Sequence, residues 1–178
     1  MDKLAKNEII KFYEEYKEIF HKRSIADMGA FNINGSVKEI LFPFGVKITG
    51  FDIIEGKGVD IVIKPGEIPP EQKNKYLIST IAQSFQFCPY PDLYKKQIKD
   101  ILEKKGFFLL ITCVQECKWH HTTTLNKYWE KRQGLRWSLK KLGNFFEEEF
   151  DIIDLYRSKD IFKKRNKHPA YILKAQKK

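Results

Sequence analysis

The segment 107–114, FFLLITCV, carries the strongest signal for a buried strand in this sequence, because eight residues pass almost without a polar side chain. Further strands are predicted along the chain from short runs of apolar and β-branched residues, at 25–28, 46–53, 59–64, 76–81, 150–156 and 170–176. A glycine-bearing loop of about five residues separates the runs 46–53 and 59–64, too few for an ordinary crossover helix.

Helices are predicted where apolar residues recur at a spacing of three or four. They cover 7–20, 37–41 and 91–105, with Gly106 expected to end the last of these, and a later run from Leu135 to Phe150. Early strands thus alternate with helices, whereas the final strand pair is joined by the basic loop RSKDIFKKRNKHP. This order predicts an open α/β sheet that is mostly parallel, with an antiparallel edge.

The length of 178 residues fits one well-buried core, so we expect a single domain over 1–178, with an N-terminal helix at 1–22 and a core at 24–177. The N-terminus lacks the apolar run and cleavage site of a secretory signal, and no apolar run is long enough to span a bilayer. We therefore expect a cytoplasmic protein with no membrane partner. Three cysteines at irregular spacing predict reduced thiols.

The net charge of +10 leaves two interpretations open. The lysines are scattered along the whole chain, which is typical of a generally basic surface. A face that binds a polyanion such as nucleic acid is the alternative. Charge alone does not decide between them.

The turn after the first strand, in IADMGAFNINGS, contains Gly29 and Gly35. In open α/β sheets this turn lines the ligand crevice, where glycine lets the backbone approach a ligand closely. The glycine spacing is longer than G-x-G-x-x-G, so a pyrophosphate cradle is not supported. Asp52 ends the second strand, where a carboxylate can accept both hydroxyl groups of a ribose. A glycine turn followed by this acid fits an adenosine ligand, although turn glycines and a strand-end Asp are also common without one.

Several segments together resemble the S-adenosylmethionine-dependent methyltransferases, above all the small members whose first turn contains Asn-Gly-Ser. The matching segments are DMGAFNINGSVKEIL, GFDIIEGKGVDIV, PYPDLY, KKGFFLLIT, the HH pair and YWEKRQGLRWSL. The resemblance covers about residues 24 to 177. It implies a Rossmann-like three-layer α/β sandwich with seven, or six, strands, mostly parallel and with an antiparallel edge strand, and S-adenosylmethionine as the cofactor.

The resemblance also assigns cofactor-binding residues. Asp27 and Gly29 would lie along the methionine portion, Asp52 would bind the ribose hydroxyl groups, and Ile53 would pack near the adenine. Glu67 would stand near the adenine amino group. The remaining residues of the expected cofactor site are Ala30, Asn34, Gly35 and Ser84. This cofactor carries a sulfonium cation and no phosphate, which favours an acidic lining.

His120 and His121 follow the predicted strand 107–114, where one of them could act as a general base on an acceptor hydroxyl group. Two exposed loop histidines are the alternative. A metal site that combines them with Cys113 and Cys117 is not favoured, because the spacing is not a usual zinc pattern. We expect no metal.

Two departures from the family pattern concern the acceptor side. Many relatives carry a Glu-His pair where this chain has Gln86 and Phe87, and an Arg where it has Glu130. Tyr128, Trp129 and Trp137 could cover the acceptor or belong to the core.

Three functional hypotheses follow. The first is methyl transfer to an oxygen or nitrogen of a small molecule or glycan precursor. The second replaces that acceptor with RNA or another nucleic acid, since net charge and aromatic residues suit phosphate contacts and stacking. The third is a non-catalytic binding protein that keeps the fold. The sequence does not indicate an oligomeric state.

Overall fold

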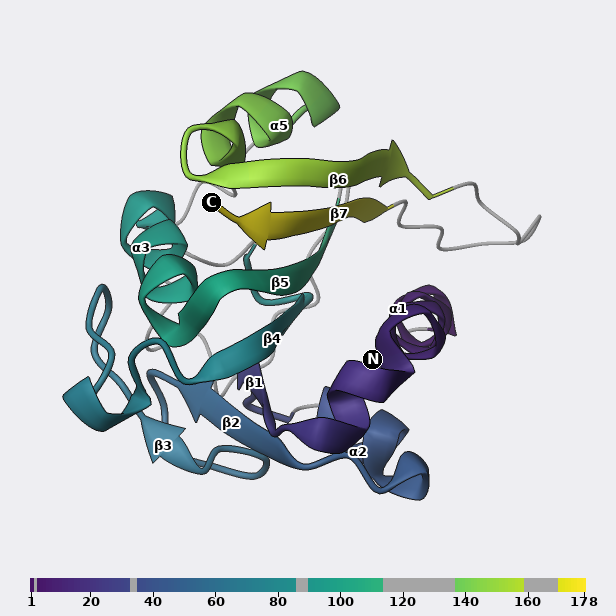
Figure 1. Ribbon diagram of the computed structural model, residues 1–178, viewed down its shortest axis with the longest axis vertical. Coiled ribbons are helices and arrows are strands. Elements are labelled where there is room, and N and C mark those ends of the chain that lie inside the picture. The colour runs from purple at the N-terminus through teal and green to yellow at the C-terminus, as the bar shows by residue number, and fades with distance from the viewer. Residues whose placement is uncertain (2, 33–34, 86–89, 114–136, 159–169) are drawn as a thin grey trace, which may run out of the picture.

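A seven-stranded sheet forms the centre of the molecule in the computed structural model, which describes residues 1, 3–32, 35–85, 90–113, 137–158 and 170–178 (Figure 1). The strand order is β3-β2-β1-β4-β5-β7-β6. The strands are β1 Ile25–Met28, β2 Ile48–Asp52, β3 Ile61–Val62, β4 Tyr76–Ala82, β5 Leu102–Cys113, β6 Phe150–Arg157 and β7 Ala170–Lys177.

The first five strands are parallel, and β7 runs antiparallel to both β5 and β6. The predicted sheet, mostly parallel with an antiparallel strand pairing at one edge, is confirmed. The strand order reverses between β1 and β4, because the chain builds outward from β1 through β2 to β3 before it returns to β4. In open α/β sheets, ligands bind at such a switch point, beyond the carboxyl ends of the strands.

Helices cover both faces of the sheet (Figure 1). One face packs against α1 Lys3–Lys22 and α2 Val37–Leu41, through residues such as Phe12 and Leu41. The opposite face packs against α3 Pro91–Ile101 and α5 Leu139–Glu147, through residues such as Ile98 and Phe146. Two short 3-10 helices, Phe42–Phe44 and Pro70–Gln72, lie in the connections. The result is the three-layer α/β sandwich that the family resemblance implies.

The N-terminal helix α1 extends beyond the periodic run 7–20, lies within the predicted N-terminal segment 1–22, and is held by a polar contact as well as by its apolar face. The hydroxyl group of Tyr156 in β6 donates a hydrogen bond of 2.5 Å to Oε2 of Glu8. Because Glu8 is buried, this bond and the ion pair with Lys11 compensate its desolvation. Among the described residues, no helix combines the length and the apolar character needed to cross a bilayer.

Two predicted helix ends are wrong. The helix α3 ends at Ile101 instead of continuing to Lys105, because Leu102 is fully buried and already pairs with Tyr76 of β4. Pairing resumes at Phe107, so the residues between form a bulge in which Lys105 has a φ of 63°. The helix α5 ends at Glu147, and Phe150 begins β6.

Candidate functional site

The turn after β1 is tied to the end of β2 by backbone hydrogen bonds. The amides of Gly29 and Ala30 both donate to the carbonyl oxygen of Phe51, at 2.8 and 3.0 Å. Gly29 has a φ of +77°, a conformation that L side chains rarely adopt. The glycine thus lets the chain turn sharply at the carboxyl end of β1 while it stays against the neighbouring strand.

The carboxylate of Asp52 lies directly beside this turn. Its Oδ2 accepts a hydrogen bond of 3.0 Å from the amide of Phe31, and its Oδ1 accepts one of 3.2 Å from the amide of Ile54. Burial raises the pKa of Asp52 above its usual value, while these backbone amides oppose the shift. The sequence predicts that the turn after β1 and Asp52 line the same ligand crevice. In the structure the two are neighbours.

A second carboxylate, that of Asp27, is buried within β1 with only 4% of the residue exposed. The hydroxyl group of Thr80 in β4 donates a hydrogen bond of 2.8 Å to its Oδ1. Burial raises the pKa of Asp27 to about 7, against the opposing effect of the Thr80 hydrogen bond, and the nearby charge of Asp52 adds to the rise. Two acidic groups thus lie close together at the carboxyl ends of β1 and β2.

The loop after β4 closes against Gly29 from the other side. A Cβ atom on Gly29 would lie 2.3 Å from both Cβ and Oγ of Ser84, a distance that real side chains do not tolerate. The Ser84 hydroxyl group donates to the carbonyl oxygen of Met28 at 3.1 Å and forms a 3.0 Å hydrogen bond with the hydroxyl group of Tyr94 in α3. Ser84, one of the predicted cofactor residues, therefore meets Gly29 in the structure.

The loop between β2 and β3 packs tightly against the same turn. A Cβ atom on Gly50 would lie 2.1 Å from the carbonyl oxygen of Gly58 and 2.8 Å from Cβ of Ala30. The amide of Asn32 donates to the carbonyl oxygen of Lys57 at 2.8 Å, and the amide of Gly50 donates to Oδ2 of Asp60 at 2.7 Å. A Cβ atom on Gly58 would in turn lie 2.6 Å from the carbonyl oxygen of Ala30, so the lack of side chains at Gly50 and Gly58 permits this loop to support the turn after β1.

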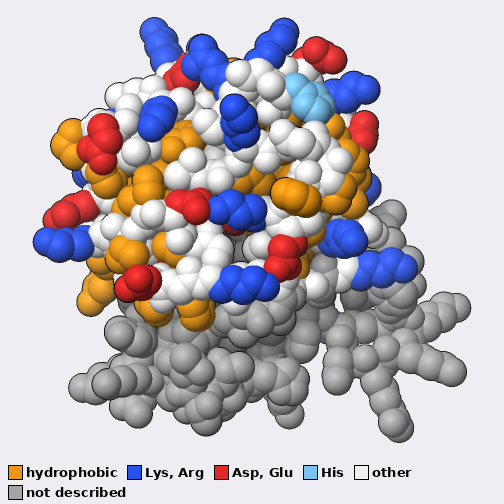
Figure 2. All heavy atoms as spheres, turned by 90° about the horizontal axis from the view of Figure 1, so that it is seen from below, with side chains coloured by type: hydrophobic (Ala, Val, Ile, Leu, Met, Phe, Trp, Pro, Cys, Tyr) orange, Lys and Arg blue, Asp and Glu red, His pale blue; other side chains and the backbone are white. Residues whose placement is uncertain are grey.

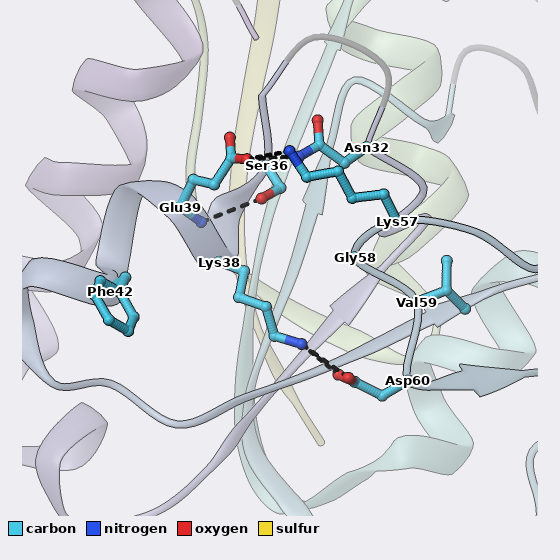
Figure 3. Close-up of a pocket in the computed structure, with 9 residues that line it drawn as sticks. All are labelled: Asn32, Ser36, Lys38, Glu39, Phe42, Lys57, Gly58, Val59 and Asp60. Atoms are coloured by element: carbon cyan, nitrogen blue, oxygen red, sulfur yellow. Dashed lines mark hydrogen bonds and ion pairs between the residues drawn. The ribbon is translucent and has the colours of Figure 1, made fainter.

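A shallow pocket on the outer side of this loop separates it from α2 (Figure 3). Its charged side chains pair with one another: Lys38 with Asp60 at 2.7 Å, and Lys57 with Glu39 at 3.0 Å. Since these charges are already compensated, the pocket itself is a poor candidate for the functional site. The pocket is lined by Asn32, Ser36, Lys38, Glu39, Phe42, Lys57, Gly58, Val59 and Asp60.

Three other predicted cofactor residues, Ile53, Gly35 and Glu67, lie in three separate loops. Ile53 follows Asp52 and is 42% exposed. The Gly35 amide donates to Oδ1 of Asn32 at 2.7 Å, next to Ser36, whose hydroxyl group caps α2. Glu67 is exposed in the loop after β3, where Gln97 donates to its carbonyl oxygen at 3.1 Å.

The remaining predicted residues lie partly inside and partly outside the described part of the chain. Of those inside it, Cys113 ends β5, and Trp137 packs against the core on the α5 side. Among the described residues, no group of three His, Cys, Asp or Glu side chains could hold a metal ion. The predicted residues outside the described part are Asn34, Gln86, Phe87, Cys117, His120, His121, Tyr128, Trp129 and Glu130.

Two residues of the site, Thr80 and Tyr94, were not predicted from the sequence. Thr80 carried a usable signal, because a hydroxyl group in the otherwise apolar strand YLISTIA needs a partner when it is buried. Tyr94 lies in the predicted helix 91–105, and nothing in the sequence indicates that its hydroxyl group reaches Ser84.

No protein-family model matches this chain, and a search of curated protein sequences finds no significant match. Solved structures do match. A Burkholderia thailandensis 1,6-didemethyltoxoflavin-N1-methyltransferase, with bound 1,6-didemethyltoxoflavin and S-adenosylhomocysteine, aligns over 99% of this chain and 79% of its own at 15% identity and a TM-score of 0.68. A SAM-dependent methyltransferase from Methanosarcina mazei aligns over 93% and 97% at 14% identity and a TM-score of 0.66.

The chain has the fold of the SAM-dependent methyltransferases. The Rossmann-like architecture that the sequence resemblance implies is thereby confirmed. The same comparison includes the [4+2]-cyclase SpnF, which aligns over 94% of this chain and 80% of its own at 14% identity and a TM-score of 0.60. Because one fold serves different reactions, function has to be argued from the site.

Proposed function

We propose that this protein binds S-adenosylmethionine and transfers its methyl group to an oxygen or nitrogen atom of a small molecule or glycan precursor. One observation carries the proposal: the Asp52 carboxylate lies at the carboxyl end of β2, hydrogen-bonded at 3.0 Å to the Phe31 amide in the turn after β1. Ligands of open α/β sheets bind at this position.

The residues at the switch point fit the chemistry of this cofactor. Asp52 uses one acceptor position on each oxygen for a backbone amide and keeps further lone pairs for the hydroxyl groups of a ribose. The exposed apolar side chain of Ile53 follows it and suits the face of an adenine. Asp27 and Gly29 would lie along the methionine portion, where a carboxylate favours the sulfonium cation. We assign Ala30, Asn34, Gly35, Glu67 and Ser84 to the surroundings of the cofactor.

The demands on the protein are modest, since the cofactor supplies a methyl group that is already activated. The residues around it have to hold the cofactor, align the acceptor with the methyl group and exclude water. An acceptor that loses a proton during attack also needs a base, and we propose His120 or His121 for this role.

The small-molecule acceptor is supported by a structural neighbour. The Burkholderia protein is a 1,6-didemethyltoxoflavin-N1-methyltransferase, and its structure contains bound 1,6-didemethyltoxoflavin. In addition, negative charge on Asp52, and on Asp27 when it is ionised, disfavours a phosphate-rich acceptor at the carboxyl ends of β1 and β2. We therefore prefer a small acceptor to a nucleic acid at this end of the sheet.

Calorimetry with S-adenosylhomocysteine tests cofactor binding. We expect Asp52→Asn to weaken binding at least tenfold, because it removes the charge and one acceptor oxygen. Asp151→Asn, an exposed acid on β6, is the matched control and should bind as the unmodified protein does. No detectable binding at millimolar concentration would overturn the proposal. Incorporation of labelled methyl groups from the cofactor, sensitive to Asp52→Asn, would separate an enzyme from a binding protein.

A further inference from the structure

The end of the sheet opposite the candidate site carries a series of basic residues. Each of four neighbouring strands, in the order β2-β1-β4-β5, has an exposed lysine at its amino end. Three precede their strands, and the fourth lies in the bulge at the start of β5. These residues, Lys47, Lys22, Lys73 and Lys104, are called the basic row below.

Backbone and side-chain contacts place these strand starts side by side. The amide of Ile25 donates to the carbonyl oxygen of Lys47 at 2.9 Å, which joins the beginnings of β1 and β2. The amide of Lys75 donates to the carbonyl oxygen of Ile101 at 3.1 Å, which joins those of β4 and β5. An ion pair between Arg23 and Glu103 links the beginnings of β1 and β5.

The basic row is not neutralised by neighbouring acids. Among the residues that the structure describes, no carboxylate oxygen lies within 4 Å of any of the four ammonium groups. The acids in the flanking segments are Glu103, which is paired with Arg23, and the exposed Glu18 and Glu71. Seen from below, Figure 2 shows Lys and Arg side chains projecting along its upper margin, with fewer acidic ones among them. A positive potential at this end follows from the uncompensated charges.

We propose that the basic row binds the phosphodiester backbone of a nucleic acid. Neighbouring strands lie about 4.8 Å apart, so the row extends over roughly 15 Å and can contact several successive phosphates. The proposal goes beyond methyl transfer, because the row lies at the amino ends of the strands and the candidate site at their carboxyl ends. The nucleic acid bound here is a docking partner and not the methyl acceptor.

An anionic membrane surface is a poorer partner for this face. Surface-bound proteins usually combine cations with apolar side chains that insert into the lipid. Among the described residues, one exposed large apolar side chain, that of Phe42 in the 3-10 helix that leads into β2, lies near the start of these four strands, and a single such residue is a weak anchor. The other exposed large apolar side chains are those of Ile53, Val62, Tyr90, Leu93 and Ile153. Because Phe42 is the one large apolar aromatic side chain exposed near these strand starts among the described residues, we expect little base stacking, and hence binding without marked sequence preference.

Fluorescence anisotropy with a labelled 20-nucleotide oligouridylate tests the proposal. The test variant is the triple substitution Lys22→Gln, Lys47→Gln and Lys73→Gln. The control variant, Lys6→Gln, Lys140→Gln and Lys141→Gln, removes the same charge from exposed lysines on α1 and α5. We expect the test variant to bind at least tenfold more weakly at low salt. The slope of log K against log salt should fall by about 2, since each lost phosphate contact removes about 0.7 for a single strand.

The control variant should change affinity less than twofold. Equal losses in both variants would mean that net charge alone attracts the RNA, and would overturn the proposal. So would the absence of binding, or stronger row-dependent binding to phosphatidylserine vesicles than to the oligonucleotide. S-adenosylhomocysteine binding, measured on the same samples, should be the same in both variants as in the unmodified protein. A protein that binds RNA through the basic row but does not bind S-adenosylhomocysteine would contradict only the proposed methyl transfer, and the reverse result would contradict only RNA docking.

Discussion

Thr80 donates a hydrogen bond of 2.8 Å to Asp27 across the register that pairs these two residues of β4 and β1. Both side chains are buried, so the carboxyl group has left water while its pKa has risen to about 7. This contact opposes the effect of burial on the pKa of an acid in the candidate site, and both partners can be tested by substitution.

Replacing Thr80 by Val should raise the pKa of Asp27 further, because the hydroxyl group that stabilises the charged form is lost. Thr80→Ser keeps the donor and serves as the control. The pKa of Asp27 can be followed by carboxyl carbon NMR. An unchanged titration in Thr80→Val would show that the hydrogen bond does not stabilise the carboxylate.

The raised pKa of Asp27 also predicts how stability changes with pH. The folded state holds this proton up to about pH 7, whereas an unfolded Asp releases it near pH 3.9. The folded protein therefore binds more protons between these values, and its stability should fall as pH rises through this window. At about 1.4 kcal/mol for each pKa unit, the contribution lost is about 2 to 4 kcal/mol.

Urea unfolding of the unmodified protein and of Asp27→Asn, at several pH values from about 4 to 8, measures this contribution. The neutral amide has no proton to lose, so the difference in unfolding free energy between the two proteins isolates Asp27. Parallel curves for both proteins would contradict a raised pKa.

Gly29→Ala should destabilise the folded protein more than the same substitution at Gly45, a glycine in another turn. Gly45 has nearly the same backbone conformation, with a φ of +71° against +77°, but a Cβ atom there would meet nothing within 4 Å. Gly45→Ala therefore isolates the backbone strain, about 1 to 2 kcal/mol. The clash with Ser84 should add about 1 to 3 kcal/mol in Gly29→Ala and weaken S-adenosylhomocysteine binding. Equal melting temperatures of the two variants would contradict the contact with Ser84.

Features of the fold that depend on local sequence patterns, or on the pairing of consecutive strands, can be predicted from the sequence. The runs IADM and FFLLITCV predict strands because their apolar side chains need burial, and the polar turn with Gly29 predicts a crevice beyond the first of them. The proximity of Asp52 to that turn is predictable too, since consecutive parallel strands pair here and bring their carboxyl ends together.

The remaining features depend on contacts between distant residues. The helix α3 ends at Ile101 because Leu102 pairs with Tyr76, and helical spacing alone gives no sign of that pairing. The meeting of Ser84 with Gly29 and Tyr94 likewise results from how the loop after β4 folds back. The support that GKGVD gives to the turn after β1 requires Gly58 to lie against Gly50, which no local pattern specifies.

Asp60 and Lys38 form an ion pair, but their removal should have unequal effects. The pair is partly exposed, with 39% of the Lys38 and 43% of the Asp60 side chain accessible, so Lys38→Ala should lower the unfolding free energy by less than about 1 kcal/mol. Asp60 also accepts the buried Gly50 amide at 2.7 Å. Asp60→Ala leaves that amide without its partner and should cost about 1 to 3 kcal/mol.

The same hydrogen bonds to Gly50 and Lys38 lower the pKa of Asp60 in the folded protein, against the effect of its burial. A lowered pKa contributes stability above the unfolded pKa and loses it as pH falls, so the excess effect of Asp60→Ala over Lys38→Ala should shrink in acid. Urea unfolding of both variants near neutral pH and near pH 3 measures this. Equal effects of the two substitutions near neutral pH would mean that Asp60 acts only through the ion pair, and that the support of β2 by this loop lies in its glycines alone.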